Sequence, residues 1–194
     1  MTFQKITVFG GASKTINGDY APEAYRLGKL IGQKGATLVF GIGDNGMMGE
    51  VFRGVLSQNA PIRGITTEKL LDLQCENPSL FKEGEIEIVP NLSVRKKQMF
   101  LEGDVMFILP GGWGTIDEFS EFAVLIQTGE IMKKPLVFIN LAGFWSPLKE
   151  QLERMYTDGC VNEARLDFVA FADTVDEAFE KAQNIQNKLD ALAS

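Results

Sequence analysis

Histidine is absent from this chain of 194 residues. Its absence excludes Ser-His-Asp triads, Cys-His nucleophile pairs and the zinc sites that depend on imidazole ligands. General acid–base chemistry, where present, must come from carboxylates, lysine, arginine or tyrosine. Cysteine is rare as well: Cys75 and Cys160 lie far apart and lack the spacing of metal ligands. We interpret them as reduced thiols of a cytoplasmic protein.

Positive charge and long hydrophobic runs are also scarce. The chain has 19 Lys and Arg against 26 Asp and Glu, which gives a formal net charge of −7. This balance argues against general binding to nucleic acid or to anionic membranes, so an anionic ligand must be held by a local cluster of donors. No run approaches the roughly 18 apolar residues of a membrane-spanning helix, and we see no signal peptide.

The chain does contain short apolar strands that alternate with amphipathic helices. This order predicts a doubly wound, Rossmann-like α/β fold with a mainly parallel sheet of about seven strands and helices on both faces. The length predicts a single domain over residues 1–194. The strands are expected at residues 6–9, 38–40, 62–65, 85–89, 105–109, 136–139 and 168–171.

The most informative stretch begins with five apolar residues, 105–109, which predict a strand buried on both faces. Pro110 ends this strand, and three glycines lead into a helical pattern. Such a junction directs unpaired backbone N–H groups and the positive end of a helix dipole at one point, where an anion is stabilised. The alternative is that the glycines only make a tight connection. Glu118, one turn into the helix, is expected at the edge of the same pocket. The residues expected to bind the anion are Gly111, Gly112, Gly114 and Thr115.

Two further glycine turns follow the first two predicted strands. Ser13 ends the first turn, where its hydroxyl can cap a helix or donate to a ligand. The second turn, Gly41 to Gly46, matches the GxGxxG pattern of dinucleotide sites, although close helix–strand packing explains this pattern equally well. Because parallel strands bring their carboxyl ends to one edge, we expect all three turns to meet there, with Ser13 and Gly43 near the ligand.

The densest positive charge, Arg95-Lys96-Lys97, lies on a helix predicted over residues 91–102. Three such charges usually form a solvated face. This helix immediately precedes the central strand, however, and an anion at the glycine turn needs a cationic partner. Arginine binds phosphate or carboxylate through two parallel hydrogen bonds, so we expect Arg95 and Lys96 to contribute to the site. The residues expected near one face of the helix are Val94, Gln98 and Leu101.

Residues 66–84 show no clear periodicity and are broken at Asn77-Pro78. They predict a long connection that covers the pocket. Its partly buried residues are expected to be Leu70, Leu71 and Leu73.

Taken in order, these motifs resemble those of the LOG family, the cytokinin riboside 5'-monophosphate phosphoribohydrolases that were long labelled lysine decarboxylases. Residues 110–118 match the family motif PGGxGTxxE at every fixed position, although some relatives with this motif bind nucleotides or cofactors without hydrolysing them. Residues 41–49 resemble GGGxxGLMG, with Ile42 where a glycine is usual. Arg95 and Lys96 match the family motif MHxRK. The departures are Leu92 and Ser93 for Met and His, and Val124 and Leu125 for the Thr and Trp of ELxTWxQ.

The resemblance implies hydrolysis of the N-glycosidic bond of a nucleoside 5'-monophosphate, such as isopentenyladenosine monophosphate or AMP, to free base and ribose 5-phosphate. It implies that Arg95 and Glu118 are catalytic, that no metal or organic cofactor is required, and that the protein is a homodimer. The alternative is a nucleotide-binding or phosphorylated-cofactor carrier that uses the same pocket without turnover. A pyridoxal-phosphate lysine decarboxylase is disfavoured, because no lysine has the sequence context of a Schiff base.

Overall fold

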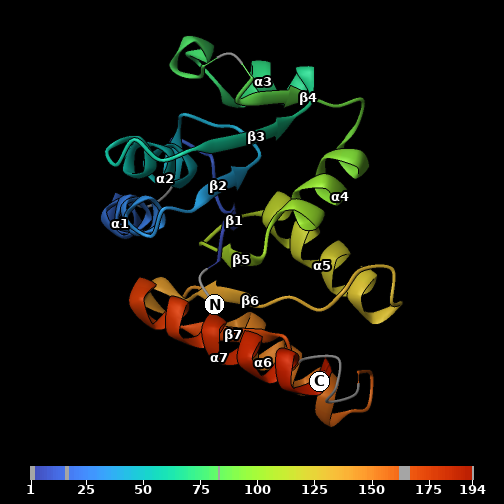
Figure 1. The fold of residues 1–194 in the computed structure, drawn as a ribbon. Coiled ribbons are helices and arrows are strands. Elements are labelled where there is room, and N and C mark those ends of the chain that lie inside the picture. Colours follow the sequence, from blue (N-terminus) through green and yellow to red (C-terminus); the bar gives the residue numbers. More distant parts are fainter. Residues whose placement is uncertain (1–2, 16–17, 83, 162–166, 194) are drawn as a thin grey trace.

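The computed structural model describes residues 3–15, 18–82, 84–161 and 167–193. Seven strands in these residues form one parallel sheet with the order β4-β3-β2-β1-β5-β6-β7 (Figure 1). The prediction of a Rossmann-like α/β fold with about seven strands is confirmed, and every pair of neighbouring strands is parallel. The strands are β1 Lys5–Phe9, β2 Thr37–Phe40, β3 Ile62–Thr66, β4 Ile86–Ile88, β5 Val105–Ile108, β6 Leu136–Ile139 and β7 Val169–Ala172.

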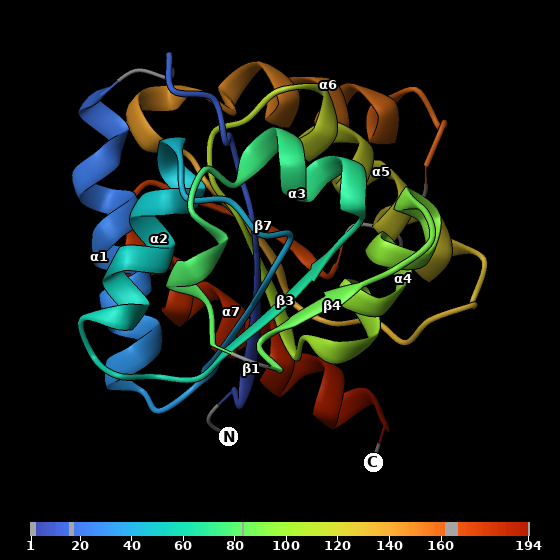
Figure 2. The ribbon, with the colours of Figure 1, turned by 90° about the horizontal axis from the view of Figure 1, so that it is seen from above.

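Helices cover both faces of this sheet, as the view from above shows (Figure 2). One face carries α1 (Ala21–Gln33), α2 (Gly46–Leu56) and α7 (Val175–Ala193). The other face carries α4 (Leu92–Glu102), α5 (Trp113–Gln127) and α6 (Ser146–Thr157). The described residues also contain three short 3-10 turns: η1 Gly18–Tyr20, η2 Pro78–Leu80 and η3 Leu141–Gly143. No helix of the described segments is long and apolar enough to cross a membrane.

The central strand β5 is buried on both faces, as its unbroken apolar run predicted. Phe107 on this strand packs edge-on against Phe179 of α7, with ring centroids 4.8 Å apart. On the other face, Phe138 of β6 packs against Phe119 of α5 at 4.9 Å. Each such pair contributes about 0.5–1.5 kcal/mol beyond the burial of its area. These contacts pack β5 against α7 on one face and its neighbour β6 against α5 on the other.

The connection between β3 and β4 contains a helix that the sequence pattern did not predict. Helix α3 (Glu68–Gln74) begins after Thr67, whose hydroxyl accepts a hydrogen bond from the Leu70 N–H at 3.2 Å. None of its residues is fully buried, and seven residues are too few to display the apolar period of a helix. Leu70 and Leu71 are half-buried as expected. Leu73, expected to be partly buried, is 74% exposed.

Candidate functional site

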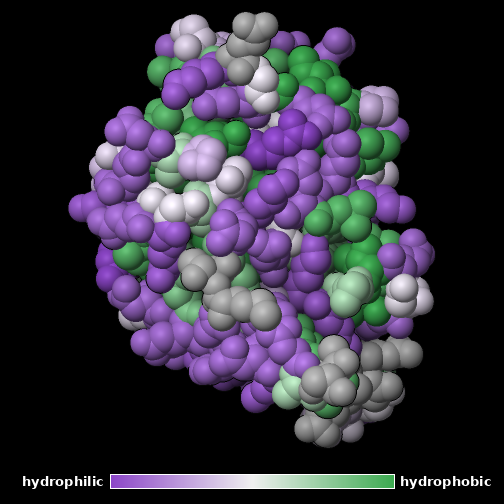
Figure 3. Space-filling view, viewed as in Figure 1, coloured by the Kyte–Doolittle hydropathy of each residue, from purple (hydrophilic) through white to green (hydrophobic). Residues whose placement is uncertain are grey.

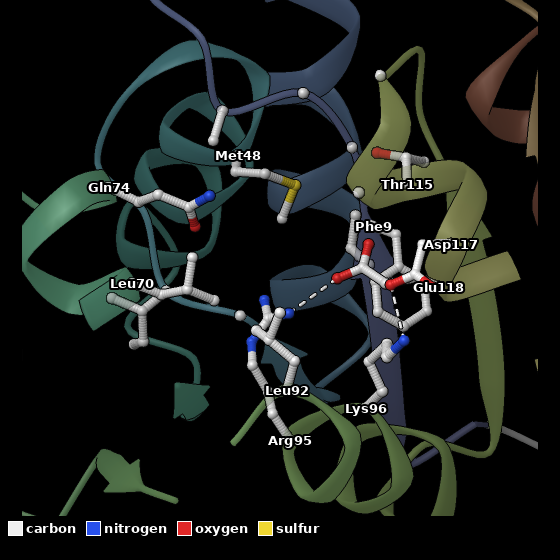
Figure 4. Close-up of a pocket in the computed structure, with 18 residues that line it drawn as sticks. Phe9, Met48, Leu70, Gln74, Leu92, Arg95, Lys96, Thr115, Asp117 and Glu118 are labelled. Carbon is white, nitrogen blue, oxygen red and sulfur yellow. Dashed lines mark hydrogen bonds and ion pairs between the residues drawn. The ribbon is translucent and has the colours of Figure 1, made fainter. Parts of the chain in front are cut away.

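Three glycine turns meet at the carboxyl end of the sheet, where the strand order reverses between β1 and β5. The Gly11 N–H donates to the Pro110 carbonyl at 2.9 Å, and the Gly11 carbonyl accepts from the Met47 N–H at 3.0 Å. These bonds join the turns that follow β1, β2 and β5. The turns line one cavity of about 240 Å³ (Figure 4). The expectation that all three would meet at this edge is confirmed.

One wall of the cavity is the start of α5. Gly112 is the N-cap of this helix and offers no side chain to its first N–H groups. Gly112 and Gly114 both line the cavity and have open space where a side chain would stand. Thr115 lines it too, and its hydroxyl forms no hydrogen bond with another described residue. Free N–H groups, a hydroxyl and the positive end of a helix dipole together suit an anion such as a phosphate.

Three residues that the sequence suggested as ligand contacts do not line this cavity in the described structure. Gly111 provides space for the Thr115 side chain, because a Cβ at residue 111 would overlap the Thr115 hydroxyl. The hydroxyl of Ser13 is paired with that of Thr15 at 2.9 Å. Gly43 lies against the backbone of the last residue of α3. The suggested residues that the fold does bring together around the cavity are Arg95, Lys96, Gly112, Gly114, Thr115 and Glu118.

Arg95 and Glu118 form a buried ion pair in the cavity wall. Arg95 Nη1 donates to Glu118 Oε1 at 3.0 Å, and Arg95 Nε donates to the Ile65 carbonyl at 3.1 Å. Their side chains are only 9% and 11% exposed. Gly41 makes this position possible, because a Cβ at residue 41 would overlap Arg95 Nη2. The glycine turn after β2 therefore provides the space that the Arg95 guanidinium group occupies.

Burial raises the pKa of Glu118 to about 7, although the charge and the hydrogen bond of Arg95 act in the opposite direction. A carboxyl group with this pKa is present in both protonation states near neutral pH. This is the property required of a general acid or base, and glycosidases tune carboxyl groups in the same way. In a chain without histidine, Glu118 is therefore the group best suited to acid–base chemistry at this site.

Lys96 is buried beside this pair, with a side chain 8% exposed. It forms ion pairs with Asp117, at 2.7 Å from Oδ2, and with Glu121. Burial alone would lower the pKa of Lys96, but the hydrogen bonds to the two carboxylates outweigh burial and raise it. The ammonium group thus holds α4 against α5. Sequence reasoning missed Asp117 and Glu121, although their i, i+4 spacing on a predicted helix puts them on one face.

The interpretation of the basic cluster as a solvated face is wrong for two of its three members. Arg95 and Lys96 are buried, and Lys97 is exposed. The apolar residues Val94 and Leu101 are 37% and 55% exposed. Helix α4 therefore directs charge inward because α5 supplies carboxylates to meet it, which the pattern of α4 alone does not reveal.

The wall opposite α5 was not predicted in detail. It is formed by Met48, Leu70 and Gln74 (Figure 4), and Ile42 and Leu92 also line the cavity. Ile42 has a φ of +64°, a rare conformation for a β-branched residue. Its side chain packs over Gly64 of β3, in the space that a Cβ at residue 64 would occupy. The replacement of the usual glycine at position 42 is accommodated by a glycine on the neighbouring strand.

The fold and the site define a Rossmann-like α/β protein whose cavity suits a small phosphorylated ligand. A protein-family model described as "possible lysine decarboxylase" matches residues 48–182. The chain belongs to this family, which is the LOG family of the resemblance noted above.

Named relatives support this assignment. The cytokinin riboside 5'-monophosphate phosphoribohydrolase LOG of Oryza sativa subsp. japonica is 29% identical over 181 residues, which cover 93% of this chain and 73% of the relative. The cytokinin riboside 5'-monophosphate phosphoribohydrolase LOG7 of Arabidopsis thaliana is 26% identical over 192 residues, which cover 99% of this chain and 87% of the relative.

Solved structures with the same fold include molybdenum cofactor proteins. The molybdenum cofactor carrier protein of Chlamydomonas reinhardtii superposes with a TM-score of 0.65 at 20% identity, covering 94% of this chain and 98% of that protein. The molybdenum cofactor binding protein of Rippkaea orientalis superposes with a TM-score of 0.61 at 19% identity, covering 94% and 95%. At this level of identity the likeness shows the fold alone.

Proposed function

We propose that this protein hydrolyses the N-glycosidic bond of a nucleoside 5'-monophosphate to free base and ribose 5-phosphate. The observation that carries the proposal is the buried Arg95–Glu118 pair, which lines the same cavity as the uncapped start of α5. The names of the relatives favour a cytokinin nucleotide, such as isopentenyladenosine monophosphate, or AMP itself.

In this reaction the phosphate binds at the N–H groups of Gly114 and Thr115 and at the Thr115 hydroxyl. The ribose then lies towards Glu118. Cleavage of the bond between C1′ and the base nitrogen develops positive charge on the ribose ring, which the Glu118 carboxylate stabilises. A water molecule supplies the hydroxyl that bonds to C1′, and its remaining proton goes to the departing base. Glu118 acts as the general base: it takes this proton from water and passes it to the leaving nucleobase, and Arg95 holds the carboxylate in place.

Water is the only co-substrate of this scheme, so the reaction requires neither a metal nor an organic cofactor. Within the described ranges, no three His, Cys, Asp or Glu side chains are grouped as metal ligands.

The direct test is incubation of the purified protein with AMP and with isopentenyladenosine monophosphate, followed by chromatography of free base and ribose 5-phosphate. We expect base release in the wild type and a loss of at least about 100-fold in Glu118→Gln. Glu150→Gln is the matched control, since Glu150 is exposed on α6, away from the cavity. Undiminished release in Glu118→Gln would remove this residue from the chemistry, and no release from the wild type would exclude the hydrolase.

A second candidate function is a carrier that binds a nucleotide or phosphorylated cofactor without turnover. It is favoured by Leu92, which lines the cavity where the family motif has methionine, and by the fold shared with molybdenum cofactor carriers. The same incubation distinguishes the two functions, because a carrier retains the intact nucleotide and releases no base.

We also propose that residues 1–194 act as one domain and that two chains form a homodimer in the cytoplasm. Large apolar side chains are exposed on and beside α5: Trp113 is 88%, Val124 54% and Met132 82% exposed. Hydrophobic surface is visible on the side of the molecule that carries α4 and α5 (Figure 3). Burial of this surface against a second copy would remove it from water.

A further inference from the structure

One polar side chain, Gln74, interrupts the apolar wall that faces α5 across the cavity. Gln74 is the last residue of α3, and its amide points into the cavity (Figure 4). No described residue forms a hydrogen bond with this amide. Leu70 and Met48 lie beside it and contribute apolar surface. A side chain with one free donor group and one free acceptor suits a ligand edge that offers the complementary pair.

The backbone around Gln74 is held in place by Asp44, which lies in the glycine turn after β2. The Asp44 carboxylate accepts hydrogen bonds from the N–H groups of Glu76, at 3.0 Å to each oxygen, and Asn77, at 2.8 Å. The Asp44 N–H in turn donates to the Gln74 carbonyl at 3.4 Å. An ion pair between Lys14 and Glu76 adds a link to the turn after β1. The end of α3 is therefore tied to the turns that form the cavity.

We propose that Gln74 is a specificity-determining residue that binds the N6–H and N7 edge of an adenine base. The inference rests on the proposed function, in which the phosphate lies at the start of α5. The ribose then extends past Arg95 and Glu118, and the base reaches the opposite wall. There the faces of the ring pack against apolar side chains while its edge meets the amide.

The hydrogen-bonding pattern selects adenine among purines. Adenine offers a donor at N6 and an acceptor at N7, and glutamine pairs with both at once. Hypoxanthine offers two acceptors on this edge, so the Gln74 Oε1 would lose its partner. A 7-deazaadenine keeps the N6 donor but lacks the N7 acceptor. An alkyl group on N6 leaves one N6–H, so an isopentenylated adenine can present the same edge.

The test is equilibrium binding of AMP, IMP and 7-deaza-AMP by calorimetry, with every protein in a Glu118→Gln background so that the nucleotides stay intact. Without a further change, we expect AMP to bind about 10-fold more tightly than either analogue. Gln74→Leu keeps the size of the side chain and removes its polar atoms, so it should bind all three nucleotides alike. Leu73→Gln is the matched control: it makes the reverse exchange on the same helix at a site 74% exposed, and should keep the preference.

Base release by the protein with Glu118 intact, measured in parallel, separates this inference from the proposed function. Equal binding of the three nucleotides before Gln74 is changed, or a preference for AMP that survives Gln74→Leu, would overturn the role of Gln74 whether or not base is released. A preference for AMP that Gln74→Leu abolishes supports that role even if no base is released. In that case the proposed hydrolysis is excluded and the carrier function is retained. Absence of nucleotide binding would overturn the role of Gln74, and absence of base release as well would overturn the proposed hydrolysis.

Discussion

Glu118 is the residue of the site whose charge the fold disfavours. A carboxyl group with an ordinary pKa of 4.5 becomes one with a pKa of about 7, mainly through burial. Between these pH values the native protein binds a proton that the unfolded chain has released. The free energy of unfolding therefore falls as pH rises from 4.5 to 7. The stability that comes from the raised pKa of Glu118 is fully present only below the pKa of the unfolded chain. A residue that lowers stability at neutral pH is typical of a functional site.

Glu118→Gln should consequently stabilise the protein at alkaline pH and have little effect in acid, where Glu118 is itself neutral. We expect a gain of about 3 kcal/mol or less in the free energy of unfolding at pH 8, shrinking towards zero near pH 4.5. Urea denaturation of both proteins at the two pH values measures this. A difference that does not change with pH would show that the pKa of Glu118 is not raised in the native state.

The second prediction at this scale concerns Gly41. A Cβ at residue 41 would overlap the Arg95 guanidinium, so Gly41→Ala should displace Arg95 from Ile65 and Glu118. We expect base release to fall by about 100-fold, as if Arg95 itself had been changed. A double-mutant cycle with Arg95→Ala checks the cause. If Gly41→Ala lowers activity further in the Arg95→Ala background, the effect does not act through Arg95.

At the scale of elements, α4 depends on a contact from a distant part of the chain. Lys134 caps the C-terminal end of this helix. Its Nζ donates hydrogen bonds to the carbonyls of Phe100 at 2.8 Å, Leu101 at 3.1 Å and Gly103 at 2.6 Å. A cation here satisfies unpaired carbonyls and opposes the negative end of the helix dipole. Burial lowers the pKa of Lys134, with Asp104 acting against the shift.

Lys134→Met should therefore lower the free energy of unfolding by about 2 kcal/mol, because it leaves these carbonyls without their charged donor. Lys133→Met is the neighbouring control. Lys133 pairs with Asp167 near the surface at 2.7 Å, and such pairs contribute roughly 1 kcal/mol or less. Urea denaturation compares the three proteins, and equal losses in both variants would argue against the capping role of Lys134.

The same element illustrates how far sequence prediction reaches. The position of α4 was predicted closely, as residues 91–102, but its environment was not. Lys134 lies 31 residues beyond Gly103, and the carboxylates that meet Arg95 and Lys96 come from α5. A helical period identifies which residues share a face. It does not identify the element against which that face packs. Here α4 packs its charged face inward because α5 supplies carboxylates that pair with Arg95 and Lys96.

For the whole molecule, the parallel sheet brings the three glycine turns to one edge and leaves apolar surface on α5. The homodimer we propose uses that surface. Val124→Lys adds a charge at a residue 54% exposed on α5. We expect the variant to sediment as a monomer and the wild type as a dimer in a sedimentation-velocity experiment. Asn187→Lys, at an exposed position on α7, is the control and should leave the dimer unchanged. A wild type that sediments as a monomer would exclude the homodimer.

The sequence by itself determined the alternation of strands and helices, the buried central strand and the glycine turn before α5, because each depends on residues adjacent in the chain. It also identified Arg95, Lys96 and Glu118 as candidates. Only the tertiary structure decided that Gly41 leaves space for the Arg95 guanidinium, that Ser13 lies outside the cavity, and that a short helix turns Gln74 into the cavity. These facts depend on contacts between segments far apart in the chain, which no local pattern of residues encodes.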